Sequence, residues 1–168
     1  TLRQAETVVT KYRNKYKKNV RYWYHLQNSA DKVSGDWDVC GPWKRYLLKS
    51  GRHLHYYGLR RGDDGLTYMK TIPSRGGKMY PTSIYAGKFA ENVTQATARD
   101  VLASAMLSID KEGYNIVSTV HDEIVVMEKE EKADDTFNHM KQLMTKKLSW
   151  AIGLPLTVEG YISQRFKK

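Results

Sequence analysis

The stretch Asn115-Ile-Val-Ser-Thr-Val-His-Asp-Glu-Ile-Val-Val-Met127 places two β-rich runs on either side of three polar residues. Two such runs separated by a short polar interruption are typical of a β-hairpin. We expect Asn115–Val120 and Ile124–Met127 to pair, with His121-Asp122-Glu123 at the turn. The two apolar runs would lock the hairpin against a core, so the turn would aim its carboxylates at a fixed point, as metal chemistry requires.

Asp122 is the residue of this turn with the clearest chemistry. Its short, hard carboxylate suits Mg²⁺, which takes oxygen ligands and keeps several waters. Aspartate is also a common turn residue, so a polar hairpin tip without chemistry is the ordinary interpretation of such a tripeptide. What surrounds the hairpin in the sequence decides between the two.

The remaining chain alternates helical and irregular patterns. Apolar residues recur at helical spacing in three segments, 2–32, 88–113 and about 131–152. Glycines and prolines divide 33–85 into short stretches, which indicates irregular structure with one or two small hairpins. Residues 156–161 can form a last strand. This order predicts an α+β fold in which an antiparallel sheet, made of the hairpin and the C-terminal strand, packs with long helices.

The composition is that of a globular protein with a strongly basic balance. Lys and Arg number 28 against 18 Asp and Glu, a formal net charge of +10. This charge favours polyanionic partners such as nucleic acids, although a basic protein without such a partner shows the same balance. No apolar run reaches the roughly 18–20 residues of a membrane span. The single cysteine, Cys40, excludes an internal disulfide. We expect no membrane partner and a cytoplasmic location, that of the host if the protein is viral.

The helical segment before the hairpin reads Tyr85-Ala-Gly-Lys-Phe-Ala-Glu-Asn-Val-Thr-Gln-Ala-Thr-Ala-Arg-Asp-Val-Leu102. It resembles the stretch G-G-K-L-x-E-N-x-x-Q-A-x-A-R-D-x-L of phage-type family A DNA polymerases. His121-Asp122-Glu123 then resembles motif C of that family, at the expected distance. Further matches lie at Ala5–Trp23, Leu48–Tyr56 and Leu154–Lys168. Five motifs in the family's order cover nearly the whole chain.

Departures from the family pattern lie outside the hairpin. Ala86 replaces the first glycine of the G-G-K step, and Tyr161 replaces the usual tryptophan. Lysine stands at two positions where proline is frequent, Lys17 and Lys49. None of these four residues touches the turn to which the resemblance assigns the chemistry.

The resemblance implies a single unit over 1–168, the C-terminal portion of a polymerase palm. It would comprise a helix following the fingers (1–32), an insert of irregular structure and hairpins (33–85) and the palm core (86–168). Two Mg²⁺ ions would serve nucleotidyl transfer in the complete enzyme. Asp122 would be a catalytic metal ligand, with Glu123 tuning the site beside it. The implied DNA-binding residues, each of which also suits an ordinary surface position, are His121, Gln95, Asn92, Arg52, Lys88 and Arg99.

Two motifs of the family are absent from the 168 residues. Motif A, D-x-S-x-x-E-x-R, supplies the second carboxylate, and motif B, K-x-x-x-F-G-x-x-Y-G, holds the incoming nucleotide. The expected partners are therefore primer-template DNA, dNTP and an upstream polymerase segment or subunit that carries both motifs. The chain alone is expected to be inactive, whether it is a truncated piece or a natural split subunit. The alternative is a non-catalytic DNA-binding module derived from a palm, but the intact His-Asp-Glu favours an enzyme part.

Overall fold

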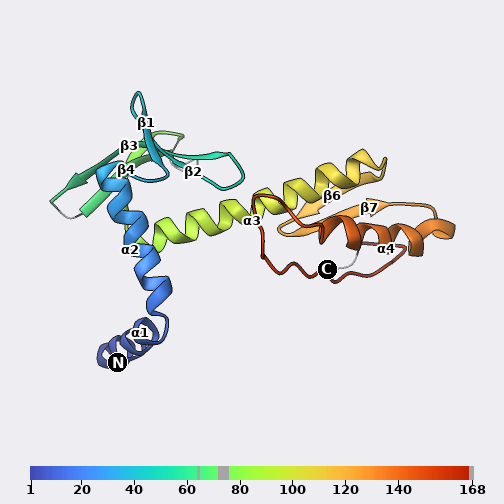
Figure 1. Cartoon of the computed structure of the whole chain (residues 1–168), viewed down its shortest axis with the longest axis horizontal. Coiled ribbons are helices and arrows are strands. Elements are labelled where there is room, and N and C mark those ends of the chain that lie inside the picture. The colour runs from blue at the N-terminus through green and yellow to red at the C-terminus, as the bar shows by residue number, and fades with distance from the viewer. Residues whose placement is uncertain (64, 72–75, 167–168) are drawn as a thin grey trace. The chain divides into compact units, whose positions relative to one another are not determined.

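A computed structural model describes residues 1–63, 65–71 and 76–166 of the chain. The chain divides into two compact units, Thr1–Gln95 and Ala96–Lys168, and each is described by itself (Figure 1). Parts of the predicted irregular segment (64 and 72–75) and the last two lysines of the C-terminal motif lie outside the described residues. The prediction that both units belong to one polymerase palm stays a prediction.

The first unit begins with two helices, α1 (Leu2–Lys15) and α2 (Lys17–Lys32). The single helix predicted over 2–32 is therefore broken at Tyr16, where φ of −108° and ψ of 48° depart from helical values. α1 has no buried residue, whereas α2 buries three, Leu26, Ser29 and Ala30. The second helix is thus the one that is anchored in the core of this unit.

A five-stranded antiparallel sheet follows, in the order β1-β2-β3-β4-β5. Its strands are β1 (Trp37–Cys40), β2 (Trp43–Leu47), β3 (His53–Gly62), β4 (Gly65–Thr71) and β5 (Met79–Ile84). The prediction of irregular structure with one or two small hairpins over 33–85 underestimates the order of this segment, because most of it belongs to one sheet of consecutive antiparallel strands. Several of its glycines lie in the tight turns between strands. The frequent glycines therefore indicate a series of strands joined by short turns and not a lack of regular structure.

The core of the first unit is aromatic. Trp37 and Tyr56, which lie on one face of the sheet, contact Phe89 with ring centroids 5.5 and 5.3 Å away. Tyr46 lies 5.3 Å from Trp37 on the same face. Phe89 comes from the first turns of α3 (Ala86–Lys111). Edge-to-face arrangements of this kind add to the stabilisation from burial, so this cluster fixes α3 to the sheet.

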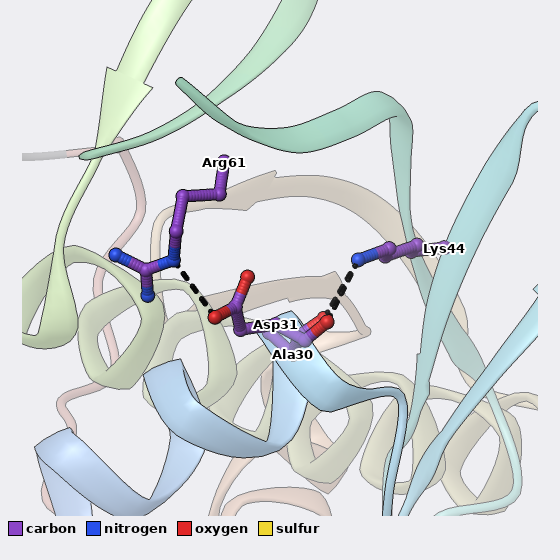
Figure 2. A network of polar contacts seen from close by, with 4 residues as sticks. All are labelled: Ala30, Asp31, Lys44 and Arg61. Atoms are coloured by element: carbon purple, nitrogen blue, oxygen red, sulfur yellow. Dashed lines mark hydrogen bonds and ion pairs between the residues drawn. The ribbon is translucent and has the colours of Figure 1, made fainter. Parts of the chain in front are cut away.

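α2 is held to the same face by polar contacts at its C-terminal end (Figure 2). Lys44 Nζ donates to the carbonyl oxygens of Ala30 and Asp31 at 3.1 and 3.2 Å. Arg61 Nε donates to the Asp31 carboxylate at 2.8 Å. The last carbonyls of a helix lack partners within the helix, and a lysine from a neighbouring strand satisfies them while complementing the helix dipole.

Tyr56 makes the stability of this unit sensitive to alkaline pH. Burial raises the pKa of its hydroxyl from an ordinary 10.0 to about 12, against the opposing effect of the hydrogen bond that Asn92 donates to it. Because the folded-state pKa is the higher one, the stabilisation is complete below about pH 10 and is lost as the pH rises toward 12. We expect the free energy of unfolding to fall over this window, less steeply in Tyr56→Phe. Urea unfolding at a series of pH values measures both slopes, and equal slopes would contradict the assignment.

The second unit contains the rest of α3, the hairpin β6 (Asn115–Val120) and β7 (Glu123–Met127), and α4 (Ala133–Met144), with the short 3₁₀ helix η2 (Glu130–Lys132) before α4. Gly113, with φ of 81°, ends α3 in the left-handed conformation that the sequence predicted.

Two predicted features of the second unit differ in the structure. The helix predicted over about 131–152 ends at Met144, and turns occupy part of the chain that follows. The strand predicted at 156–161 is not formed, and within the described residues the sheet of this unit has only the strands β6 and β7. A strand forms only when its backbone pairs with a neighbouring strand, and no described strand is paired with these residues. The α+β class with antiparallel strands is confirmed. In the part of the chain that is described, no helix has the length and apolar character to cross a membrane.

Candidate functional site

The hairpin turn is tighter than the sequence suggested. Val120 pairs with Glu123, which leaves His121 and Asp122 as a two-residue loop. Glu123 is therefore the first residue of β7 and not part of the turn. All three side chains are exposed. The loop thus presents Asp122 at its tip, with the carboxylate of Glu123 on the adjoining strand residue.

His121 holds an unusual backbone conformation in this loop. Its φ is 55°, and Asp122 is not among the residues with positive φ. A positive φ at the first loop residue alone is the pattern of a type II′ turn, which favours glycine at that position. A residue with a side chain is strained there, and such strain tends to gather at functional sites. The conformation of the residue before Asp122 is therefore set by the hairpin against the local preference of the chain.

The base of the hairpin is tied to α4. A hydrogen bond of 2.7 Å joins the Tyr114 hydroxyl to His139 Nδ1, and the two rings lie 5.6 Å apart. The strands themselves are less buried than predicted, since no residue of β6 or β7 is fully buried. Buried apolar side chains of this unit lie on α3, including Leu102, Ala105 and Ile109. The expectation that the strands lock into a core is met only in part.

The described residues do not form a complete cation site. Asp122 on the loop and Glu123 on β7 are adjacent acids, but no group of three His, Cys, Asp or Glu side chains in the described ranges is arranged to hold a metal ion. A pair of Mg²⁺ ions lies roughly 3.5–4 Å apart and needs carboxylates from more than one segment. This chain's own described residues therefore do not fit a two-metal centre by themselves.

Three of the predicted DNA-binding residues lie on α3 within the first unit. Lys88 Nζ donates to both carboxylate oxygens of Glu91 at 2.9 Å, which raises the pKa of Lys88. The Asn92 amide donates to the Tyr56 hydroxyl at 3.1 Å. Gln95 is exposed. Two of the three side chains therefore already have partners within the unit, while Gln95 is presented to solvent.

The two remaining predicted contacts are both exposed arginines. Arg52 lies in the turn between β2 and β3, where its carbonyl accepts a hydrogen bond of 2.8 Å from the Leu48 amide and Gly51 adopts a φ of 89°. The L-K-S-G-R motif is thus the sequence of a tight hairpin turn. Arg99 lies on α3 in the second unit. The DNA contacts of both arginines stay predictions.

Sequence reasoning missed an exposed aromatic group on the sheet of the first unit. The ring of Trp43 on β2 is in contact with the rings of His55 and Tyr57 on β3. Part of the signal was present in His53-Leu-His-Tyr56, where polar and apolar residues alternate as in a strand with one solvated face.

The chain is similar to a known enzyme over nearly its whole length. It is 33% identical to the DNA polymerase of Bacillus phage SP02 over 178 residues, an alignment that covers 96% of this chain and 27% of that polymerase. No protein-family model matches the chain, and no solved structure matches it. The chain thus spans 27% of the length of the relative it matches, and its similarity to that phage DNA polymerase extends through both compact units.

Proposed function

We propose that this chain is a palm segment of a family A DNA-directed DNA polymerase that supplies the motif C carboxylate, Asp122, and binds primer-template DNA. The observation that carries the proposal is the 33% identity to the Bacillus phage SP02 DNA polymerase across 96% of the chain. The geometry of the hairpin supports it. An exposed carboxylate on a two-residue loop between paired strands is accessible to a cation, a nucleotide and a second protein segment.

In this proposal Asp122 and Glu123 hold one part of a Mg²⁺ site. An upstream polymerase segment or subunit with motifs A and B supplies the other carboxylate and holds the dNTP. Bound Mg²⁺ would stabilise the charge that develops on the attacking and leaving oxygens. His121, the exposed neighbour of Asp122, is the candidate hydrogen-bond donor to the primer terminus. The role of this chain is therefore to position one imidazole and one acid on a short loop, with a second acid on the strand residue that follows.

Primer-template DNA is the proposed macromolecular ligand. Gln95 is exposed on α3 and suits the minor groove, where the pattern of donors and acceptors is degenerate and supports contacts that do not depend on sequence. Arg52, Lys88 and Arg99 are candidate phosphate contacts, for which Lys88 would have to exchange its partner Glu91 for DNA. Asn92 would likewise have to leave the Tyr56 hydroxyl. Of these residues, Gln95 is the one we expect to contribute most directly.

A second candidate function is a DNA-binding module without chemistry. It is favoured by the distribution of charge, because the Lys and Arg excess lies in the first unit and the hairpin lies in the second. Such a module would bind DNA normally without any acid at position 122. The two functions therefore differ in whether Asp122 is needed.

The proposal is tested by a chimera in which this chain replaces the aligned segment of the SP02 polymerase. We expect the chimera to extend a primed template with Mg²⁺ and dNTPs, and the isolated chain to extend nothing because motifs A and B are missing. The parent SP02 polymerase is the positive control. A folded chimera that binds primer-template DNA without extending it would overturn the enzymatic assignment. Extension by the isolated 168-residue chain would overturn the expected dependence on a partner.

A further inference from the structure

One face of the five-stranded sheet carries aromatic side chains that are partly or largely exposed. Trp43 on β2 is paired with Tyr57 on β3, and Arg45 is paired with His55. Because side chains alternate along a strand, these four point away from the face that holds Tyr46 and Tyr56. We call this group, Trp43, Arg45, His55 and Tyr57, the open face. The contacts of α2 and α3 with the sheet that were described above all involve the opposite face (Figure 2).

The rings of the open face form a platform around Trp43. Its ring centroid lies 5.0 Å from that of Tyr57 and 5.9 Å from that of His55, at interplanar angles of 75° and 89°. The Trp43 side chain is 36% exposed, His55 is exposed and Tyr57 is half-buried. Neighbours thus support the tryptophan ring while much of it remains in contact with solvent.

Arg45, which is paired with His55 on the open face, is itself held in place by an ion pair with Asp38. Its guanidinium donates to both oxygens of Asp38, at 2.8 and 2.6 Å, and this contact lowers the pKa of the Asp38 carboxyl. A bidentate pair of this kind restrains the plane of the guanidinium. Guanidinium planes and aromatic rings both offer flat surfaces on which a nucleobase stacks.

The charge of the chain is concentrated in the unit that carries this face. The first unit has 18 Lys and Arg against 7 Asp and Glu, a formal net charge of +11, whereas the second has 10 against 11, a net charge of −1. The excess of positive charge in the protein therefore lies entirely in the unit that contains this sheet. A polyanion is the partner whose charge complements this unit. Among polyanions, a nucleic acid with unpaired bases can also stack those bases on the aromatic rings.

We propose that the open face binds single-stranded nucleic acid, with an unpaired base stacked on Trp43 and the phosphate backbone attracted by the charge of the first unit. A duplex buries the faces of its bases, so it gains nothing from the platform. The inference stands on the first unit alone and holds whether or not Asp122 is a metal ligand. The competing explanation is that Trp43 and Tyr57 form an ordinary cross-strand pair that only stabilises the sheet.

The test is the Kd of the whole chain for a fluorescent oligothymidylate of about 12 nucleotides, measured by anisotropy at one fixed salt concentration. We expect Trp43→Leu to weaken binding about tenfold, Trp43→Phe to stay within about threefold, and His55→Ala to weaken it about threefold. Tyr24→Leu is the matched control, since Tyr24 is a 48% exposed aromatic side chain on α2 of the same unit. Affinity for duplex DNA should be the same in all four variants.

An abasic oligonucleotide of the same length separates stacking from charge, and we expect it to bind more weakly than the thymidylate. The proposal is overturned if the abasic strand binds equally well, or if Trp43→Leu and Tyr24→Leu have equal effects. Circular dichroism reports whether Trp43→Leu folds. If Trp43→Leu does not fold, the Kd of His55→Ala decides instead, because the His55 side chain is exposed and outside the core. Asp122→Asn should leave this Kd unchanged, so failure here is distinguishable from failure of the proposed polymerase role.

Discussion

Asp122→Asn in the chimera with the SP02 polymerase is expected to lower primer extension by at least about 100-fold while the Kd for primer-template DNA stays within about twofold. The substitution keeps the shape of the side chain and removes its charge. An amide is a poor ligand for Mg²⁺ beside a phosphate, because it cannot offset the charge of the cation. Asp122 is exposed on a two-residue loop, so the fold should not depend on it. Initial rates of primer extension and a separate DNA titration give the two quantities.

Asp110→Asn is the matched control for this experiment. Asp110 is an exposed acid near the end of α3 in the same unit, and its loss removes the same charge from a place with no proposed chemistry. We expect it to leave extension within about twofold of the unmodified chimera. If Asp122→Asn also leaves extension intact, Asp122 is not a catalytic ligand. If it abolishes DNA binding together with extension, Asp122 acts in DNA binding, a result that neither candidate function predicts.

The hairpin and the central helix could be predicted because their signals are local. Two runs of branched apolar residues around a polar step define β6 and β7, and Gly113 marks the end of α3 by its need for a positive φ. The sheet of the first unit could not be predicted in the same way. Its strands are short, glycines interrupt them, and their pairing depends on contacts with Phe89 and α2 that lie far away in the sequence.

The position of the candidate site on a hairpin could be predicted from the sequence, whereas its chemistry stays a prediction. Nothing local distinguishes a carboxylate at a hairpin tip from an ordinary turn residue, and only the resemblance across the chain gave Asp122 a role. The structure adds the strained φ of His121 and moves Glu123 from the turn into β7. In the proposed function, the rest of a two-metal centre depends on residues of another segment. The open face was overlooked for a related reason, since its rings come from alternate positions on two strands whose register no local pattern defines.

Phe89→Ala is expected to lower the free energy of unfolding of the first unit by about 3–5 kcal/mol. Phe89 is fully buried and its ring is in contact with Trp37 and Tyr56, so truncation leaves a cavity between α3 and the sheet. Folded domains are stable by only about 5–15 kcal/mol, so this loss is a large part of the total. Urea unfolding followed by tryptophan fluorescence measures it, because Trp37 lies in the affected cluster.

Leu107→Ala is the control on the same helix, since Leu107 is 70% exposed, and we expect it to change stability by no more than about 0.5 kcal/mol. A loss below about 1 kcal/mol in Phe89→Ala would show that the cluster does not anchor α3.

We expect Phe89→Ala to affect DNA binding as well as stability. Gln95 lies fewer than two turns beyond Phe89 on the same helix, and Trp43 lies on the other face of the sheet that Phe89 supports. Loosening this one ring should therefore weaken primer-template binding and single-strand binding together, whereas Asp122→Asn should weaken neither.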